Sequence, residues 1–197
     1  MTAIPGKQVI YFNDDPSRTI YFLKKGKVKL VRIAEDGQEM IMDIVNAGEP
    51  FGENALFDEE RRGDIAVSMD DCLLCAIDKD RFEEIARNSP GLNIGLVKFV
   101  GFRLRKFRHR LEMLTFKDAR QRVMELIKEL SEQYGRRVGN ELLIRNFLTH
   151  EEMGELTGLK RQTVSTILNE LKKEGVVDFN RKHIILPDPE KFFKLSK

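Results

Sequence analysis

The chain has 197 residues, with 34 Lys and Arg against 32 Asp and Glu and a formal net charge of +2. This length suits one large or two small domains with buried cores. Two cysteines exclude a disulfide framework, and no apolar run approaches the ~20 residues that span a bilayer. The first residues also lack the pattern of a signal peptide. We therefore expect a cytoplasmic protein with no membrane partner.

Charge is divided unevenly along the chain. Residues 1–90 carry 12 Lys and Arg against 18 Asp and Glu, whereas residues 91–197 carry 22 against 14. An acidic half followed by a basic half indicates that only the C-terminal part approaches nucleic acid.

Short strands dominate the first 80 residues. β-Branched and aromatic residues predict strands over 7–12, 19–24, 27–34, 39–45, 65–68 and 72–78, and turn signals separate them. Many short strands without long helices between them indicate an antiparallel sandwich or barrel. A short helix is expected over 80–88.

Cys72 and Cys75 form a C-x-x-C motif, a spacing that also occurs in zinc sites, iron–sulfur sites and thiol switches. Residues three apart on a strand point to opposite faces, and no further cysteine or nearby histidine completes a ligand set. We expect buried structural thiols and no metal. The spacing of His109, His150 and His183 suggests no haem site.

Pro90 begins a predicted long helix with an apolar heptad seam. A seam of this kind packs either on its own domain or on a second copy of itself, and the charges around it favour a two-fold homodimer. His109, on the same helix, is expected to be solvated among arginines. The seam consists of Val97, Val100, Leu104, Phe107, Leu111 and Leu114.

A second helix is predicted over 119–134, followed by a polar loop over 135–140 and a short strand over 142–144. The next segment, 148–171, has the pattern of two helices joined by a tight turn. Thr149 and Glu152 predict a capping box, and Gly158 allows a left-handed turn. A helix-turn-helix is therefore expected.

The second of these helices combines a buried apolar side with a polar side. Many helical domains expose a polar side that is merely solvated. Here, however, the side chains are of types that contact phosphates and base edges. Two β-branched runs around Asn180, Arg181 and Lys182 also predict a hairpin, which would make the motif a winged one. The polar residues are Lys160, Arg161, Gln162, Ser165, Thr166 and Asn169.

The order of these parts resembles the CRP/FNR family of bacterial transcription regulators. The resemblance is carried by I-Y-F-L-K-K-G-K-V-K-L in the early strands, F-G-E-N-A-L-F at 51–57, F-K-D-A-R-Q-R-V, and the helix-turn-helix segment. It implies an α+β fold with a β-roll (double-stranded β-helix) sensor domain over 1–90, a dimerisation helix over 91–115 and a winged helix-turn-helix over 116–197. Compared with many relatives the chain starts late, so the family's leading helix is expected to be shortened or missing.

The resemblance also implies how DNA would be read. Arg161 stands where the family grips a guanine, while Gln162 replaces a glutamate and Thr166 an arginine of the cyclic-AMP receptor. The half-site should therefore differ from that receptor's. Base-reading candidates are Arg161, Gln162, Ser165, Thr166 and Asn169. Phosphate candidates are Thr149, His150, Lys160, Thr163, Arg181 and Lys182. The expected partners are double-stranded DNA and RNA polymerase.

The effector pocket departs from the family's pattern. Gly52 and Glu53 match its phosphate-binding cassette, but Gly63 or Asp64 falls where the cyclic-AMP binders carry arginine. Phe107 and Arg108 occupy the positions at which the cyclic-AMP binders of the family contact adenine. We therefore expect no cofactor and no response to cyclic AMP.

Two alternatives within the same family remain open. Arg61 or Arg62 could bind a cyclic-nucleotide phosphate, or the protein could be a redox or haem sensor of the same family. A cyclic-nucleotide module with a partner other than DNA disagrees with the basic C-terminal half. An enzyme on a double-stranded β-helix would need histidines in the strand region, which has none. We expect no enzyme.

Overall fold

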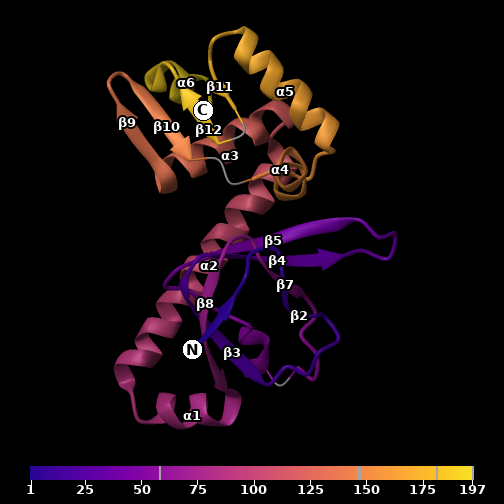
Figure 1. Ribbon diagram of the computed structural model, residues 1–197, viewed down its shortest axis with the longest axis vertical. Coiled ribbons are helices and arrows are strands. Elements are labelled where there is room, and N and C mark those ends of the chain that lie inside the picture. The colour runs from indigo at the N-terminus through magenta and orange to yellow at the C-terminus, as the bar shows by residue number, and fades with distance from the viewer. Residues whose placement is uncertain (58, 146–147, 181, 197) are drawn as a thin grey trace. The chain divides into compact units, whose positions relative to one another are not determined.

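The computed structural model describes residues 1–57, 59–145, 148–180 and 182–196 (Figure 1). The chain divides into two compact units, Met1–Leu104 and Arg105–Lys197. The division falls within the long helix α2 (Pro90–Phe116), so one helix contributes residues to both units. Among the described residues, no helix is both long and apolar enough to cross a membrane.

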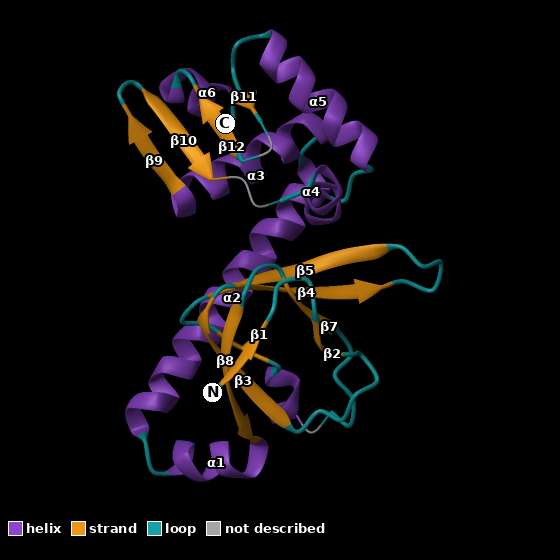
Figure 2. Cartoon of the chain, viewed as in Figure 1, coloured by secondary structure: helices purple, strands orange, loops and turns teal. Residues whose placement is uncertain are grey.

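The first unit contains two four-stranded antiparallel sheets (Figure 2). One has the order β1 (Thr2–Ile4), β8 (Cys72–Asp78), β3 (Thr19–Lys25), β6 (Pro50–Phe51). The other has the order β2 (Val9–Tyr11), β7 (Ile65–Ser68), β4 (Lys27–Ile33), β5 (Glu39–Asn46). The antiparallel sandwich is thus confirmed, with β1 and β6 as short strands that the sequence pattern did not predict.

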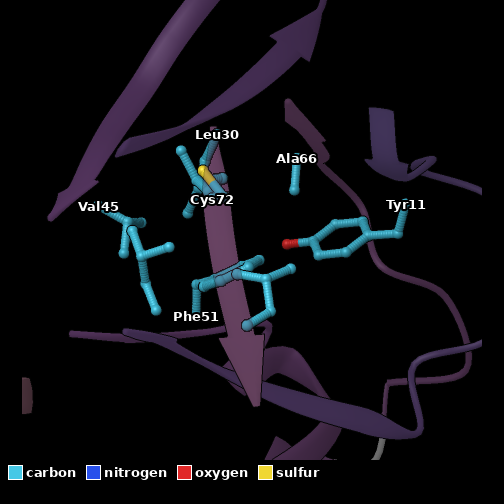
Figure 3. Packing of buried hydrophobic residues seen from close by; sticks show 9 residues of the cluster. Tyr11, Leu30, Val45, Phe51, Ala66 and Cys72 are labelled. Carbon is cyan, nitrogen blue, oxygen red and sulfur yellow. The ribbon is translucent and has the colours of Figure 1, made fainter. Parts of the chain in front are cut away.

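Residues from both sheets form the core of this unit. The cluster comprises Tyr11, Leu23, Val28, Leu30, Val45, Phe51, Ala66, Cys72 and Leu74. Figure 3 shows the ring of Tyr11 directed into this cluster. Cys72 is buried within it, whereas Cys75 is only half-buried. In the described part of the chain, no group of three or more His, Cys, Asp or Glu side chains could hold a metal.

A second cluster attaches three helical elements to β3. Ile20, Ala55 and Phe82 are its buried members, and Leu92 and Leu96 of α2 pack against them. These residues bring together η1 (Glu53–Phe57), α1 (Lys79–Arg87) and the first turns of α2. One face of α2 is thereby covered by its own unit.

The second unit combines helices with a four-stranded sheet. Its helices are α3 (Ala119–Tyr134), α4 (His150–Thr157), α5 (Arg161–Lys173) and α6 (Pro189–Leu195). Its sheet has the order β11 (Asp178–Phe179), β12 (His183–Leu186), β10 (Glu141–Arg145), β9 (Gly135–Val138). The loop predicted over 135–140 was wrong for its first four residues. They form β9 because their backbone pairs with Glu141–Ile144 across a tight turn at Gly139, whose φ is +62°.

Polar contacts join the C-terminal end of α2 to α3 and α4. The Arg122 guanidinium donates to the carbonyl oxygens of Leu114 (2.8 Å), Lys117 (3.0 Å) and Thr157 (3.4 Å). His109 Nε2 lies 3.1 Å from a carboxylate oxygen of Glu129. The expectation that His109 is solvated among arginines was therefore wrong, because α3 brings acidic side chains to it.

Candidate nucleic-acid interface and sensor pocket

The first motif helix begins as the sequence predicts. Thr149 Oγ1 accepts from the Glu152 N–H (3.1 Å), and the Glu152 carboxylate accepts from the Thr149 N–H (2.9 Å). This confirms the capping box. Gly158 ends the helix with φ +67°, as predicted for a left-handed cap. Thr149, a phosphate candidate, already uses its hydroxyl in the cap.

A second glycine makes the turn tight, and the sequence interpretation missed it. A Cβ at Gly154 would lie 2.4 Å from the carbonyl oxygen of Leu159. The Leu159 N–H donates to the Gly154 carbonyl at 2.9 Å, so the two backbones touch. A glycine in the middle of a predicted helix was the available signal.

The second motif helix, α5, separates its apolar and polar residues as predicted. Val164, Ile167, Leu168 and Leu171 are buried. Arg161, Gln162, Thr166 and Asn169 are exposed, while Thr163 and Ser165 are half-buried. The N-cap residue Lys160 makes no side-chain cap, so the first N–H groups of α5 lack a side-chain acceptor at that position. The result is a polar face next to an uncapped helix N-terminus.

Two hydroxyls on this face are already engaged. Thr166 Oγ1 donates to the carbonyl of Gln162 at 3.0 Å. Ser165 Oγ lies 2.7 Å from His150 Nδ1, which joins a base-reading candidate to a phosphate candidate. Burial and the nearby Arg161 guanidinium lower the pKa of His150. Its imidazole is therefore neutral at neutral pH.

Ionic contacts fix α5 at its C-terminal end. The Arg120 guanidinium of α3 binds both carboxylate oxygens of Glu174, at 2.9 and 2.5 Å. Lys172 Nζ lies 2.5 Å from Asp178 and 5.3 Å from the ring centroid of Phe179. The helix is thus connected to α3 on one side and to β11 on the other.

The predicted wing is the hairpin of β11 and β12 (Figure 1). Asn180 Oδ1 accepts from the N–H groups of Lys182 (2.8 Å) and His183 (3.0 Å), which closes the turn. The Lys182 side chain is exposed at the tip. Arg181, the other phosphate candidate here, lies outside the described residues.

In the first unit, Gly52 and Glu53 lie beside two arginines. Gly52 has φ +76°, and a Cβ there would meet Arg62 Nη1 at 2.8 Å. Glu53 forms an ion pair with Arg103 of α2, which also lies 3.6 Å from Asp43. The Glu53 carboxylate is therefore already paired with a guanidinium of its own unit.

Arg62 is 2% exposed and is held on several sides. Its Nη1 donates to the carbonyls of Thr19 (2.7 Å) and Gly52 (3.4 Å). Its guanidinium carbon lies 4.6 and 5.4 Å from the ring centroids of Tyr11 and Tyr21. Its Nε, among the described residues, has no hydrogen-bond partner.

Asp64 faces this same group of side chains. It accepts from the Tyr11 hydroxyl at 3.1 Å. Burial raises the pKa of Asp64, and burial together with Asp64 raises the pKa of Tyr11. Arg61, by contrast, is exposed and lies 3.5 Å from Asp14, so of the two arginines only Arg62 is buried beside Gly52.

The predicted seam of α2 is largely uncovered. The exposed fractions are 73% for Val97, 56% for Val100, 47% for Leu104, 58% for Phe107 and 57% for Leu111. Leu114 is half-buried, with Cδ2 3.0 Å from where a Cβ of Gly158 would lie, so it packs at the end of α4. Arg108 and Phe107, named for the effector pocket, are exposed residues of the second unit.

Two family models match the chain. A model of the cyclic nucleotide-binding domain matches residues 2–89, and one of the Crp-like helix-turn-helix domain matches residues 121–195. The first range contains both sheets of the first unit, and the second contains α4, α5 and the wing. Together they match most of the chain.

Individual proteins with similar sequences are also CRP-like regulators by name. A protein of Thermus thermophilus named cyclic AMP receptor protein is 34% identical over 173 residues, which are 88% of this chain and 77% of that protein. A CRP-like cAMP-activated global transcriptional regulator of Mycobacterium tuberculosis is 26% identical over 193 residues, 98% of this chain and 86% of that protein.

The fold is also found among solved structures. A variant of CooA from Carboxydothermus hydrogenoformans has a TM-score of 0.86 at 25% identity, covering 100% of this chain and 87% of that one. The sequence comparisons and the fold comparison therefore agree that this chain is similar to CRP-like regulators.

Proposed function

Because the chain belongs to the CRP/FNR family of transcription regulators, we propose that it binds palindromic promoter sites as a homodimer and does so without cyclic AMP. Its Crp-like helix-turn-helix is a DNA-binding domain. We further propose that the protein acts in the cytoplasm and has RNA polymerase as a partner. The residues proposed to read DNA lie on α5.

The reading face of α5 carries the DNA-binding part of the proposal. Arg161 and Gln162 are exposed in the first turn of α5, and neither makes a side-chain bond to another described residue. In a winged helix-turn-helix, the N-terminal residues of the second helix reach base edges in the major groove. A free guanidinium there suits guanine O6 and N7, and a free amide suits adenine N6 and N7.

The exposed seam of α2 supports the homodimer. An apolar stripe at heptad spacing with exposed fractions up to 73% is costly in water. A second copy of the same helix would cover it by coiled-coil packing. Two-fold symmetry would then place two copies of α5 about one helical turn, ~34 Å, apart on a palindrome.

The contacts already made by Glu53 and Arg62 support independence from cyclic AMP. The Glu53 carboxylate already pairs with Arg103, and Arg62 already binds two carbonyls and stacks on two rings. An entering nucleotide would have to displace these contacts. Asp64, when ionised, would also repel a phosphodiester.

One observation favours a second candidate function, a regulator that depends on a cyclic nucleotide. Arg62 lies beside Gly52 of the cassette, and its buried Nε has no partner among the described residues. A phosphate oxygen could satisfy it. Relatives named as cyclic-AMP-activated or as cyclic AMP receptor are consistent with this candidate.

The two candidates separate in one experiment. DNA sites are selected from a random pool with ligand-free protein, and the selected site is then titrated with and without cyclic AMP at several salt concentrations. Salt-dependent binding to a palindrome without additive supports the main proposal. Binding that requires cyclic AMP, and that is lost in Arg62→Met, would establish the second candidate instead.

A further inference from the structure

His150 connects three elements of the DNA-binding unit. It is the first residue of α4, its Nδ1 lies 2.7 Å from Ser165 Oγ of α5, and its ring meets Phe179 of β11 edge-on with centroids 5.8 Å apart. The imidazole is half-buried at this junction. It therefore fixes the side chain of Ser165 on the polar face of α5.

The direction of this hydrogen bond decides what Ser165 can offer to a base. A serine hydroxyl has one proton and two acceptor lone pairs. If Nδ1 accepts that proton, Ser165 has only lone pairs left. If Nδ1 carries a proton and donates it, the hydroxyl proton is free for a base. A neutral imidazole has one N–H, so the contact made at Nε2 selects between these states.

We propose that His150 fixes Ser165 as a hydrogen-bond acceptor, so that α5 selects a base that presents an amino group at the position facing Ser165. That base would be adenine through N6 or cytosine through N4. This role rests on the proposed DNA binding. Nε2 has no partner among the described residues, and a DNA phosphate accepts but never donates. A phosphate at Nε2 therefore selects the tautomer with its proton on Nε2, and Nδ1 must then accept from Ser165.

The surroundings of the imidazole favour its neutral form. Burial and Arg161 lower the pKa of His150. The other charged groups nearby are Lys172 and Asp178 around Phe179, and Glu151 and Glu152 next in the chain. In the complex, the phosphate at Nε2 would act in the opposite direction to Arg161 and raise the pKa of His150. In acid, an imidazolium would donate from both nitrogens. The Ser165 proton would then be released, and the preference would move toward guanine or thymine, whose O6 or O4 accept.

The experiment compares two substitutions of His150, each of which places a polar amide where one of the two ring nitrogens lies. In His150→Gln the amide reaches the place of Nε2 but cannot reach Ser165. In His150→Asn the amide takes the place of Nδ1, where its oxygen can accept from Ser165, but nothing reaches the phosphate. The base position that faces Ser165 is identified as the one whose preference disappears in Ser165→Ala. Affinities for all four bases at that position are then measured.

At about pH 7.5 the wild-type protein is expected to favour adenine or cytosine there by about 3- to 10-fold, the scale of one hydrogen bond. His150→Gln should lose this preference and keep its overall affinity. His150→Asn should keep the preference and weaken binding to all sequences alike. At about pH 5 the wild-type preference should decline or reverse.

A preference that survives in His150→Gln and does not change with pH overturns the role of His150. So does uniform weakening by both variants, which is the result expected if the ring only packs against Phe179. Failure of every one of these proteins, wild type included, to bind a specific site would instead contradict the proposed DNA reading.

Discussion

At the scale of single residues, Glu125 shows how the second unit accommodates a charge in its core. The residue is 4% exposed. Lys117 Nζ lies 2.5 Å and Lys128 Nζ 3.1 Å from its carboxylate oxygens. Burial acts to raise the pKa of Glu125, but the two ammonium groups outweigh it, and the net pKa is lowered. The resulting stability is present above the ordinary titration range of glutamate and is lost as pH falls through the lowered pKa.

Replacing Lys117 tests this arrangement. Lys117→Met should reduce the free energy of unfolding by about 2–3 kcal/mol at about pH 7, because Glu125 would stay buried and, among the described residues, would keep only Lys128 and His109 as nitrogen partners. Denaturant unfolding followed by circular dichroism measures the loss. Lys128→Met, at a more exposed partner (34% against 28%), should cost less. The difference between wild type and Lys117→Met should shrink as Glu125 is protonated, and a pH-independent difference would contradict the ionic explanation.

Arg161 and Lys160 are neighbours with different expected roles. Arg161→Ala should cost about 1–3 kcal/mol of binding and relax one base pair of the site, because a guanine contact is lost. Lys160→Ala should weaken binding to all sequences alike and lower the dependence of affinity on salt. Titrations of matched and mismatched operators at several salt concentrations measure both effects. If both variants lost the same amount of affinity for matched and mismatched operators, the assignment of Arg161 as a base-reading residue would be contradicted.

The residue-level features that sequence reasoning missed are pairings between distant segments. The pattern predicts that Arg161 and Gln162 are exposed, because helical spacing alone assigns them to the polar side. It cannot show that Ser165 meets His150, or that His109 meets Glu129, because these contacts depend on how α2, α3, α4 and α5 pack. The burial of Arg62 was missed for the same reason.

At the scale of elements, local signals predicted the helix boundaries well. The capping box at Thr149, the glycine cap at Gly158 and the proline at the start of α2 each act within one turn. Strand β9 was missed because G-R-R-V has little strand propensity, and pairing with β10 decides its conformation. The short strands β1 and β6 depend on their partners in the same way.

Gly154 provides a prediction about the turn between α4 and α5. Gly154→Ala should reduce the free energy of unfolding by about 2 kcal/mol or more and weaken DNA binding, because a Cβ would lie 2.4 Å from the Leu159 carbonyl oxygen. Thermal unfolding and a mobility-shift titration measure the two effects. Gly139→Ala is the control: Gly139 has open space around it, so this variant should lose only about 1 kcal/mol, the cost of placing alanine at a φ of +62°. Normal DNA binding by Gly154→Ala would show that the turn can widen harmlessly.

At the scale of the whole molecule, the pattern of the sequence predicted an antiparallel sheet unit, a long helix and a winged DNA-binding unit, and the α+β fold is confirmed. Periodicity and turn residues were sufficient because each unit has its own core. The charged cluster around Glu53 in the sensor unit was harder to predict. Its charges come from four separate segments around Asp43, Glu53, Arg62 and Arg103, which only the fold brings together.

The proposed homodimer leads to the prediction for the assembled protein. Leu104→Glu should raise the dissociation constant of the dimer at least about tenfold, because two carboxylates would be buried in an apolar seam. Light scattering over a dilution series measures the mass, and the same variant should bind a palindrome less tightly than wild type. Lys98→Glu, an exposed position of α2 outside the seam, is the control and should remain dimeric. An unchanged mass for Leu104→Glu would remove the seam from the dimer interface.

The Arg122 guanidinium has a consequence for protein engineering. It donates to carbonyl groups near the ends of two helices, Leu114 and Lys117 at the end of α2 and Thr157 at the end of α4. The two helix ends therefore share one donor and cannot be redesigned independently. A chimera that receives only residues 148–173 would leave the Thr157 carbonyl without this donor. A graft that transfers this DNA-reading motif should carry α3 and the last turns of α2 with it.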